Sequence, residues 1–169
     1  MKAKLIIEGK EIEIEISEEE YKKLQPPKEK KTGYERVPEN CDFYYESSGA
    51  TVELGFDERC YIDDKYYDVA NYYSSETVAE NNARADKLMR QLRRFAVEHR
   101  ECGVNFSDTD TKNYCIEYDY DDGELRISFV FCSKKFGAIY FDSEETTQAA
   151  IAEFRDELIW YFTEYKDSL

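Results

Sequence analysis

Several features that often reveal function are scarce or missing in this chain of 169 residues. There is one histidine, His99, and the five cysteines at positions 41, 60, 102, 115 and 132 form no Cys-x-x-Cys pair. We therefore expect reduced, mostly buried thiols, and a Cys–His dyad only if the fold brings the two together by coincidence. The sequence also contains no glycine-rich phosphate loop, no His-Glu-x-x-His and no nucleophile elbow.

Long apolar runs and a net positive charge are also lacking. No run approaches the roughly 18 apolar residues of a membrane span, and the N-terminal apolar stretch is too short for a signal peptide, so we expect a cytoplasmic protein without membrane contact. The formal net charge is −15, which disfavours direct binding to phosphate backbones. It favours a basic protein partner, with an acidic surface that only confers solubility as the alternative.

The N-terminal region is predicted to be a small appendage. Residues 3–8 and 11–16 flank Gly9-Lys10, and the second segment alternates apolar and charged residues, which indicates a β-hairpin. Ser17 and Glu20 form a capping box that opens a short helix ending by residue 25. Pro26-Pro27 begins a polar linker, 26–40, and the main domain is placed at 41–169.

The main domain contains an internal similarity. Residues 72–76, Tyr-Tyr-Ser-Ser-Glu, correspond to residues 140–144, Tyr-Phe-Asp-Ser-Glu, 68 positions later. Each segment follows strand-like stretches and precedes a capped helix with apolar residues three or four apart, including Val78, Leu88 and Leu92. We predict two β-β-β-α units, at about 41–100 and 114–165. Their third strands are predicted at 66–73 and 136–141, and their helices at 75–100 and 143–165.

The predicted fold class is therefore α+β. The two β-β-β-α pseudo-repeats are expected to form one mainly antiparallel sheet with both long helices on one face. The hairpin and short helix are added at the N-terminus, and that hairpin is a possible surface for a homodimer because two strands are marginally stable alone.

Charge is unevenly distributed. Residues 41–73, 101–142 and 143–169 carry net charges of −6, −5 and −5, whereas residues 74–100 carry +2. A basic ridge on the first long helix either contacts an acidic partner or pairs internally, for example Glu80 with Arg84 and Asp86 with Arg90. We favour internal pairing because the remaining surface repels polyanions. The ridge consists of Arg84, Lys87, Arg90, Arg93, Arg94 and Arg100.

The acidic turns allow two interpretations. The Asp108–Tyr114 loop fails as a calcium-binding EF-hand because its fifth position is Lys112 and it lacks the glycine, so no cofactor is expected. A metal-dependent nuclease using paired carboxylates such as Asp63-Asp64 remains an alternative. Carboxylates spaced by tyrosines on a rigid fold also imitate the charge of nucleic acid. The candidate partner-binding residues are Asp57, Glu58, Asp63, Asp64, Asp68, Asp119, Asp121 and Asp122.

Four segments carry a family resemblance: residues 71–76, 92–100, 139–145 and 154–162. They resemble small accessory proteins of phages and mobile elements of Gram-positive bacteria, a group associated with anti-CRISPR inhibitors. The resemblance covers most of residues 1–165. It implies action in the bacterial host cytoplasm against a defence system, and it implies no catalytic residue.

The first hypothesis is therefore a non-enzymatic inhibitor that binds a basic groove of a CRISPR-associated RNA-guided nuclease, where backbone charge normally holds guide RNA and target DNA. A second hypothesis is a phage nuclease that cleaves guide RNA with the help of a metal ion. A third is a regulatory or structural protein that dimerises through the N-terminal hairpin.

Overall fold

The computed structural model describes residues 2–7, 10–15, 17, 19 and 31–168. The chain is mixed α+β, as predicted, and divides into two compact units, Met1–Lys31 and Thr32–Leu169. In the first unit, β1 (Lys2–Ile7) pairs antiparallel with β2 (Lys10–Glu15), which confirms the N-terminal hairpin. Most of the predicted helix at 17–25, and residues 26–30 of the linker, lie outside the described residues.

The second unit begins with a hairpin of β3 (Asp42–Glu46) and β4 (Val52–Phe56), followed by α2 (Tyr61–Asp68). The predicted third strand at 66–73 is wrong, because its first residues continue this helix. The Asp63 carboxylate accepts the Cys60 N–H at 3.0 Å, which caps the helix start. The Tyr66 ring then packs against Tyr45 at a tilt of 32°, with 4.5 Å between the ring centroids.

The first long helix, α3 (Glu76–Glu98), agrees closely with the prediction. The Ser75 hydroxyl caps it by accepting the Val78 N–H at 3.5 Å. The apolar stripe is buried along most of its length, with Val78, Leu88 and Leu92 each less than 5% exposed. The stripe fails only at its C-terminal end, where His99 is exposed.

A second hairpin follows, β5 (Asn113–Asp119) with β6 (Glu124–Val130), and Gly123 occupies a positive φ of 72° in its turn. The predicted helix at 143–165 is instead two helices, α4 (Glu144–Glu153) and α5 (Arg155–Thr163). The break occurs at Phe154, whose φ of −107° and ψ of 20° are not helical. Its ring packs edge-on against Phe95 in the core.

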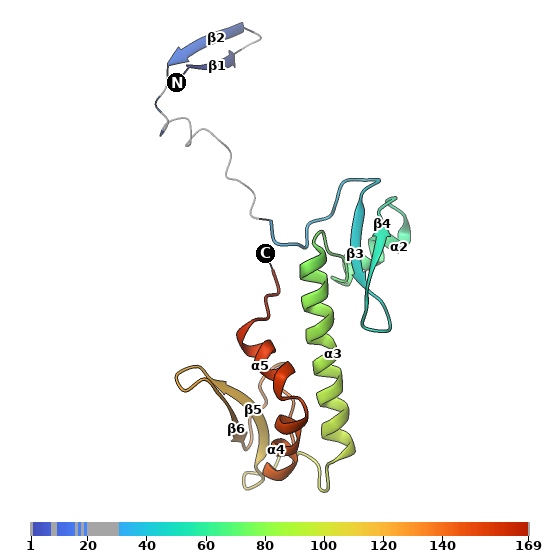
Figure 1. The fold of residues 1–169 in the computed structure, drawn as a ribbon, viewed down its shortest axis with the longest axis vertical. Helices are drawn as coiled ribbons and strands as arrows, with labels where there is room; N and C mark the ends of the chain where they lie inside the picture. Colours follow the sequence, from blue (N-terminus) through green and yellow to red (C-terminus); the bar gives the residue numbers. More distant parts are fainter. Residues whose placement is uncertain (1, 8–9, 16, 18, 20–30, 169) are drawn as a thin grey trace. The chain divides into compact units, whose positions relative to one another are not determined.

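The predicted single sheet is wrong, because the described strands form three separate two-stranded sheets. The predicted third strand at 136–141 contributes only one bridge, Tyr114 with Phe141, and the first hairpin has a similar bridge between Tyr44 and Tyr73. The helices consequently do not share one sheet face. In Figure 1, α3 passes β3 and β4 with its N-terminal half, while α4 and α5 pack beside it and α4 contacts β5 and β6.

Two clusters form the core of the second unit. The larger cluster joins the C-terminal half of α3 to α4 and α5 and includes Leu88, Leu92, Phe141, Ile151 and Leu158. The smaller cluster joins the start of α3 to the first hairpin through Tyr73, Val78 and Ala79, with Tyr34 and Tyr44 packed against it. Aromatic side chains thus fill the junctions between the small sheets and the helices.

Residues 32–40, predicted to be linker, belong to the second unit. Gly33 lies against Val78, and its carbonyl accepts the Ser74 N–H at 2.7 Å. Arg36 forms an ion pair with Asp57. The boundary therefore falls between Lys31 and Thr32 rather than at residue 41, because these contacts tie the segment to α3 and to the first hairpin.

Candidate protein-binding surface

Asp57 is fully buried and belongs to an internal network. Its carboxylate accepts hydrogen bonds from Arg36 Nε at 3.0 Å, from the Tyr72 hydroxyl at 2.7 Å and from the Arg59 N–H at 2.8 Å. Burial opposes ionisation of this carboxyl, but the three donors outweigh burial and hold the pKa of Asp57 at about 2. Asp57 is thus a charged structural residue without a surface for a partner.

The other candidates around α2 differ in exposure. Asp63 is 6% exposed and accepts the N–H groups of Glu58 and Cys60 at the helix start. Asp64 is exposed but pairs with Arg36, with 2.7 Å between Nη1 and Oδ1. Glu58 and Asp68 are exposed, and no ion pair with another described residue involves them. Only these two offer free carboxylates here.

The turn between β5 and β6 is held together internally. Asp119 accepts the N–H groups of Asp122 and Asp121, and these hydrogen bonds lower the pKa of its carboxyl. Arg126 pairs with Asp119 at 2.6 Å and also with Asp122. Asp121 is exposed and forms no ion pair with the part of the chain that the structure describes.

The eight predicted contact residues therefore do not form one acidic surface. Asp57 and Asp63 are wrong as partner contacts because they are buried. Arginines within the same unit neutralise three others. Only three of the eight predicted residues remain exposed without an ion pair to a described residue. The neutralised residues are Asp64, Asp119 and Asp122, and the remaining ones are Glu58, Asp68 and Asp121.

Sequence reasoning missed a larger group of free carboxylates on the last two helices. Glu144 and Glu145 line one shallow hollow on α4 together with Gln148, Ala149 and Ala152. All of the carboxylates named below are exposed, and among the described residues none of them forms an ion pair. The net charge of −5 for residues 143–169 was the available signal. We call this group the α4–α5 carboxylates: Glu144, Glu145, Glu153, Asp156 and Glu164.

Three of the six residues of the basic ridge of α3 form ion pairs within the fold: Arg84, Arg90 and, with Glu98 on the same helix, Arg94. Arg84 pairs with Glu157 on α5 at 2.7 Å and lies over the Trp160 ring, 3.9 Å from its centroid. Arg90 pairs with Glu46 on β3. These contacts favour the structural interpretation of the ridge, through partners on other elements instead of the predicted Glu80 and Asp86.

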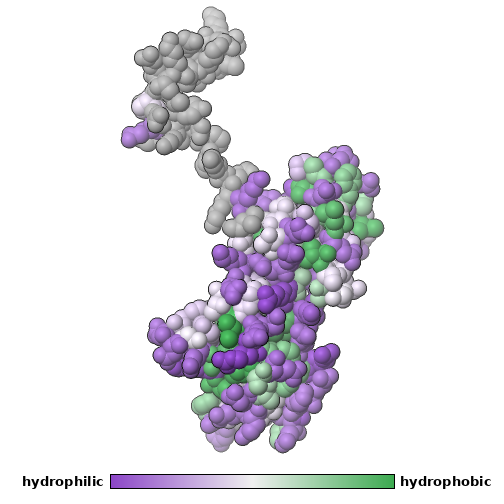
Figure 2. Space-filling model, in the orientation of Figure 1, coloured by the Kyte–Doolittle hydropathy of each residue, from purple (hydrophilic) through white to green (hydrophobic). Residues whose placement is uncertain are grey.

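Exposed apolar side chains lie near Glu58 and Asp68, the free acidic residues around α2. Figure 2 shows hydrophobic residues gathered over the part of the unit formed by β3, β4 and α2. Tyr61, Ile62 and Val69 of this region are 70%, 61% and 71% exposed. Apolar and aromatic surface of this kind next to carboxylates is typical of protein-binding sites.

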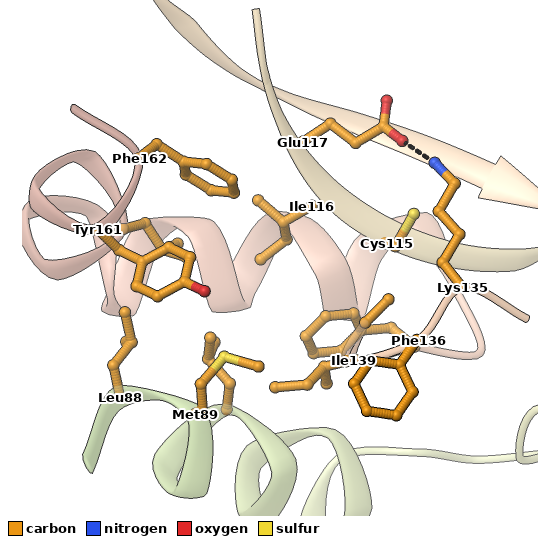
Figure 3. Close-up of a pocket in the computed structure, with 15 residues that line it drawn as sticks. Leu88, Met89, Cys115, Ile116, Glu117, Lys135, Phe136, Ile139, Tyr161 and Phe162 are labelled. Atoms are coloured by element: carbon orange, nitrogen blue, oxygen red, sulfur yellow. Dashed lines mark hydrogen bonds and ion pairs between the residues drawn. The ribbon is translucent and has the colours of Figure 1, made fainter. Parts of the chain in front are cut away.

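An apolar groove of about 270 Å³ lies in the other half of the unit, between β5, α3 and α5. Figure 3 shows Met89, Ile116 and Tyr161 around it, with the ion pair of Lys135 and Glu117 at its rim. Cys115 also lines the groove, and burial raises the pKa of its thiol. The expectation of mostly buried thiols is wrong, because the other four cysteines are exposed.

The described residues contain no group of three or more His, Cys, Asp or Glu side chains placed to hold a metal ion. His99 ends α3: its Nδ1 lies 3.0 Å from the Phe95 carbonyl, and its ring stacks on Phe95, which agrees with a capping role.

None of the helices in the part that the structure describes is long and apolar enough to cross a lipid bilayer. Comparison of the chain with protein-family models, curated proteins and solved structures finds no match.

Proposed function

We propose that this chain is a non-enzymatic phage anti-defence protein that binds a basic, nucleic-acid-holding groove of a CRISPR-associated RNA-guided nuclease in the bacterial host cytoplasm. The observation that carries the proposal is the placement of charge. Residues 1–31 carry eight acidic and eight basic residues, so the whole net charge of −15 belongs to the unit Thr32–Leu169. A rigid polyanion of this kind competes for grooves that hold nucleic acid through backbone charge.

The proposed contacts differ from those expected from the sequence. No arginine of the described residues neutralises the α4–α5 carboxylates, and Glu58, Asp68 and Asp121 add to them. Exposed tyrosines, among them Tyr61 at 70% and Tyr120 at 72%, supply contact area that loses little entropy on binding. The buried Asp57 and Asp63 support the fold instead.

The test is inhibition of a purified RNA-guided nuclease by charge-reversed variants. Reversing two carboxylates on one helix, with Glu145→Lys and Glu153→Lys together, is expected to weaken inhibition about tenfold or more, because like charges meet across the groove. The matched control reverses Glu101 and Asp110, which lie in the loop before β5, so the net charge changes equally.

The two pairs are compared after urea unfolding has shown that both variants fold. Equal inhibition by both variants and the unchanged protein would contradict the proposal. Cleavage of guide RNA that stops when a chelator is added would instead support the metal-dependent nuclease.

A further inference from the structure

The two hairpins of the second unit make the same kind of single contact with the segment before a capped helix. Tyr44 and Tyr73 exchange two main-chain hydrogen bonds of 2.9 Å, and Tyr114 and Phe141 exchange bonds of 2.9 and 2.8 Å. Main-chain groups along an antiparallel strand alternate between its two neighbours. Every second residue of β3 and of β5 therefore presents its N–H and C=O away from the hairpin partner.

On β3 the next residue that presents its main-chain groups outward is Glu46, and a side-chain amide forms hydrogen bonds with both of these groups. The Glu46 N–H donates to Asn71 Oδ1 at 2.7 Å, and the Glu46 C=O accepts from Asn71 Nδ2 at 2.8 Å. Asn71 precedes the bridging residue Tyr73 by two positions. One amide thus satisfies the two groups that a third strand would otherwise pair.

On β5 no side chain forms the corresponding hydrogen bonds among the described residues. The residue two positions before Phe141 is Ile139, whose side chain has no donor or acceptor. Among the described residues, the outward-facing main-chain groups of Ile116 and Tyr118 form no hydrogen bond. An edge strand with unpaired groups of this kind is a template for pairing with another chain.

The open edge of β5 borders the apolar groove. Ile116 and Ile139 both line it, with Leu88, Met89 and Tyr161 around them, and Figure 3 shows these side chains directed toward the same space. Phe136 stands fully exposed at the rim. The groove therefore offers apolar contacts beside free main-chain donors and acceptors, the two components of strand addition.

We propose that the edge of β5 binds an extended peptide segment of a partner protein as an added antiparallel strand. Peptide residues opposite Ile116 and Tyr118 place their side chains on the groove side and are apolar. The residue between them lies opposite Glu117, whose carboxylate now pairs with Lys135 at 2.6 Å, and it is basic. The recognised pattern is apolar, basic, apolar.

Charge selects a foreign partner over a second copy of this chain. The unit as a whole carries a net charge of −15, and this charge attracts a basic segment and repels another copy. The inference rests on main-chain pairing and does not depend on the proposed nuclease inhibition.

The test uses the full chain and a set of five-residue peptides capped at both ends. Each peptide has threonine at positions one and five and lysine or arginine at position three. Positions two and four are valine, isoleucine, leucine or phenylalanine. We expect at least one peptide to bind with a Kd of about 1 mM or tighter and to shift the amide NMR signals of Ile116 and Tyr118. Failure of every peptide to shift those signals would overturn the proposal.

Two controls separate strand addition from nonspecific apolar binding. N-methylation of the peptide groups that face β5 is expected to abolish binding, and Ile139→Asn, which imitates Asn71, is expected to weaken it about tenfold or more. Ile139→Val keeps the groove apolar and is expected to bind normally. Binding unaffected by N-methylation, or concentration-dependent dimerisation that shifts the same amides, contradicts the proposal even if Ile139→Asn fails to fold.

Discussion

At the residue scale, the acidic side chains divide into those that build the fold and those that remain free. Asp57 shows why sequence alone does not separate them. It stands in a polar stretch, Asp57-Glu58-Arg59, that resembles an exposed turn, yet it is fully buried. Its side-chain donors, Tyr72 and Arg36, are 15 and 21 residues away in the sequence. A local sequence pattern does not predict such distant partners.

Removing one hydrogen-bond donor to Asp57 measures how much this network contributes to the stability of the protein. Tyr72→Phe deletes the hydroxyl that donates to Asp57 and accepts the Val37 N–H. We expect the free energy of unfolding, measured with urea at pH 7, to fall by about 1.5–3 kcal/mol, since the lost bond is to a buried charge. Tyr61→Phe, at a surface position where the hydroxyl forms no hydrogen bond with a described residue, is the control and is expected to change stability little. A similar stability for both variants would contradict the structural role of Asp57.

The same carboxylate predicts a pH dependence. The pKa of Asp57 is lowered to about 2 in the folded protein from an ordinary value of 3.8, so its stabilisation is complete above about pH 4 and is lost as the pH falls toward 2. Asp57→Asn is expected to lower stability at pH 7 and to reduce the slope of stability against pH between 4 and 2. An unchanged slope in urea titrations across this range would contradict the assignment.

At the scale of elements, short local signals predicted most of the structure. Gly9-Lys10 predicted the N-terminal hairpin, and the similar segments 72–76 and 140–144 predicted the starts of α3 and α4. The errors occur where tertiary contacts decide. α2 forms because Asp63 caps it and Tyr66 packs on Tyr45, and the break at Phe154 places its ring against Phe95.

The boundary of the second unit gives a prediction at this scale. A chain beginning at Thr32 is expected to unfold with about the same free energy as the full chain, because the contacts of residues 32–40 are kept. A chain beginning at Cys41 loses the ion pair of Arg36 with Asp57 and is expected to lose about 3 kcal/mol or more. Equal stability of the two shortened chains would return the boundary to residue 41.

Gly33 offers a finer test of the same segment. A Cβ at this position would lie 2.6 Å from Val78 Cγ2, and its φ of +94° disfavours any side chain. Gly33→Ala is expected to destabilise the protein by about 2–4 kcal/mol in urea unfolding. Gly103→Ala is the control, since it also has a positive φ but no atom within 4 Å of the added Cβ. An equal or larger loss at Gly103 would show that backbone strain, without the contact to Val78, explains the effect.

At the scale of the whole molecule, the fold class was predictable and the arrangement of its sheets was not. The similarity of residues 72–76 to 140–144 suggested a third strand in each unit, but each segment makes only one bridge before it leaves the sheet. Beyond that bridge, Asn71 hydrogen-bonds the edge of β3, whereas Ile139 lines a groove beside the edge of β5. The alternation of apolar and polar residues along a strand does not predict this difference.

The distribution of charge is likewise a property of the folded unit. Net charge predicted a basic partner, but the candidate residues came from turns, where Arg36 and Arg126 neutralise several of them. Further free carboxylates lie on α4 and α5 and just after α5, within residues 143–169, whose net charge of −5 points to no individual contact residue.

The most direct test of the central claim, a folded polyanion occupying a cationic groove, is the salt dependence of its competition with guide RNA for a purified RNA-guided nuclease. Between about 50 and 300 mM salt, we expect the Kd of the protein for the nuclease to rise about tenfold or more, because the contacts are largely between exposed charges. We also expect guide RNA to displace the bound protein. A Kd that is constant over this range, or simultaneous binding of guide RNA and protein, would contradict this claim.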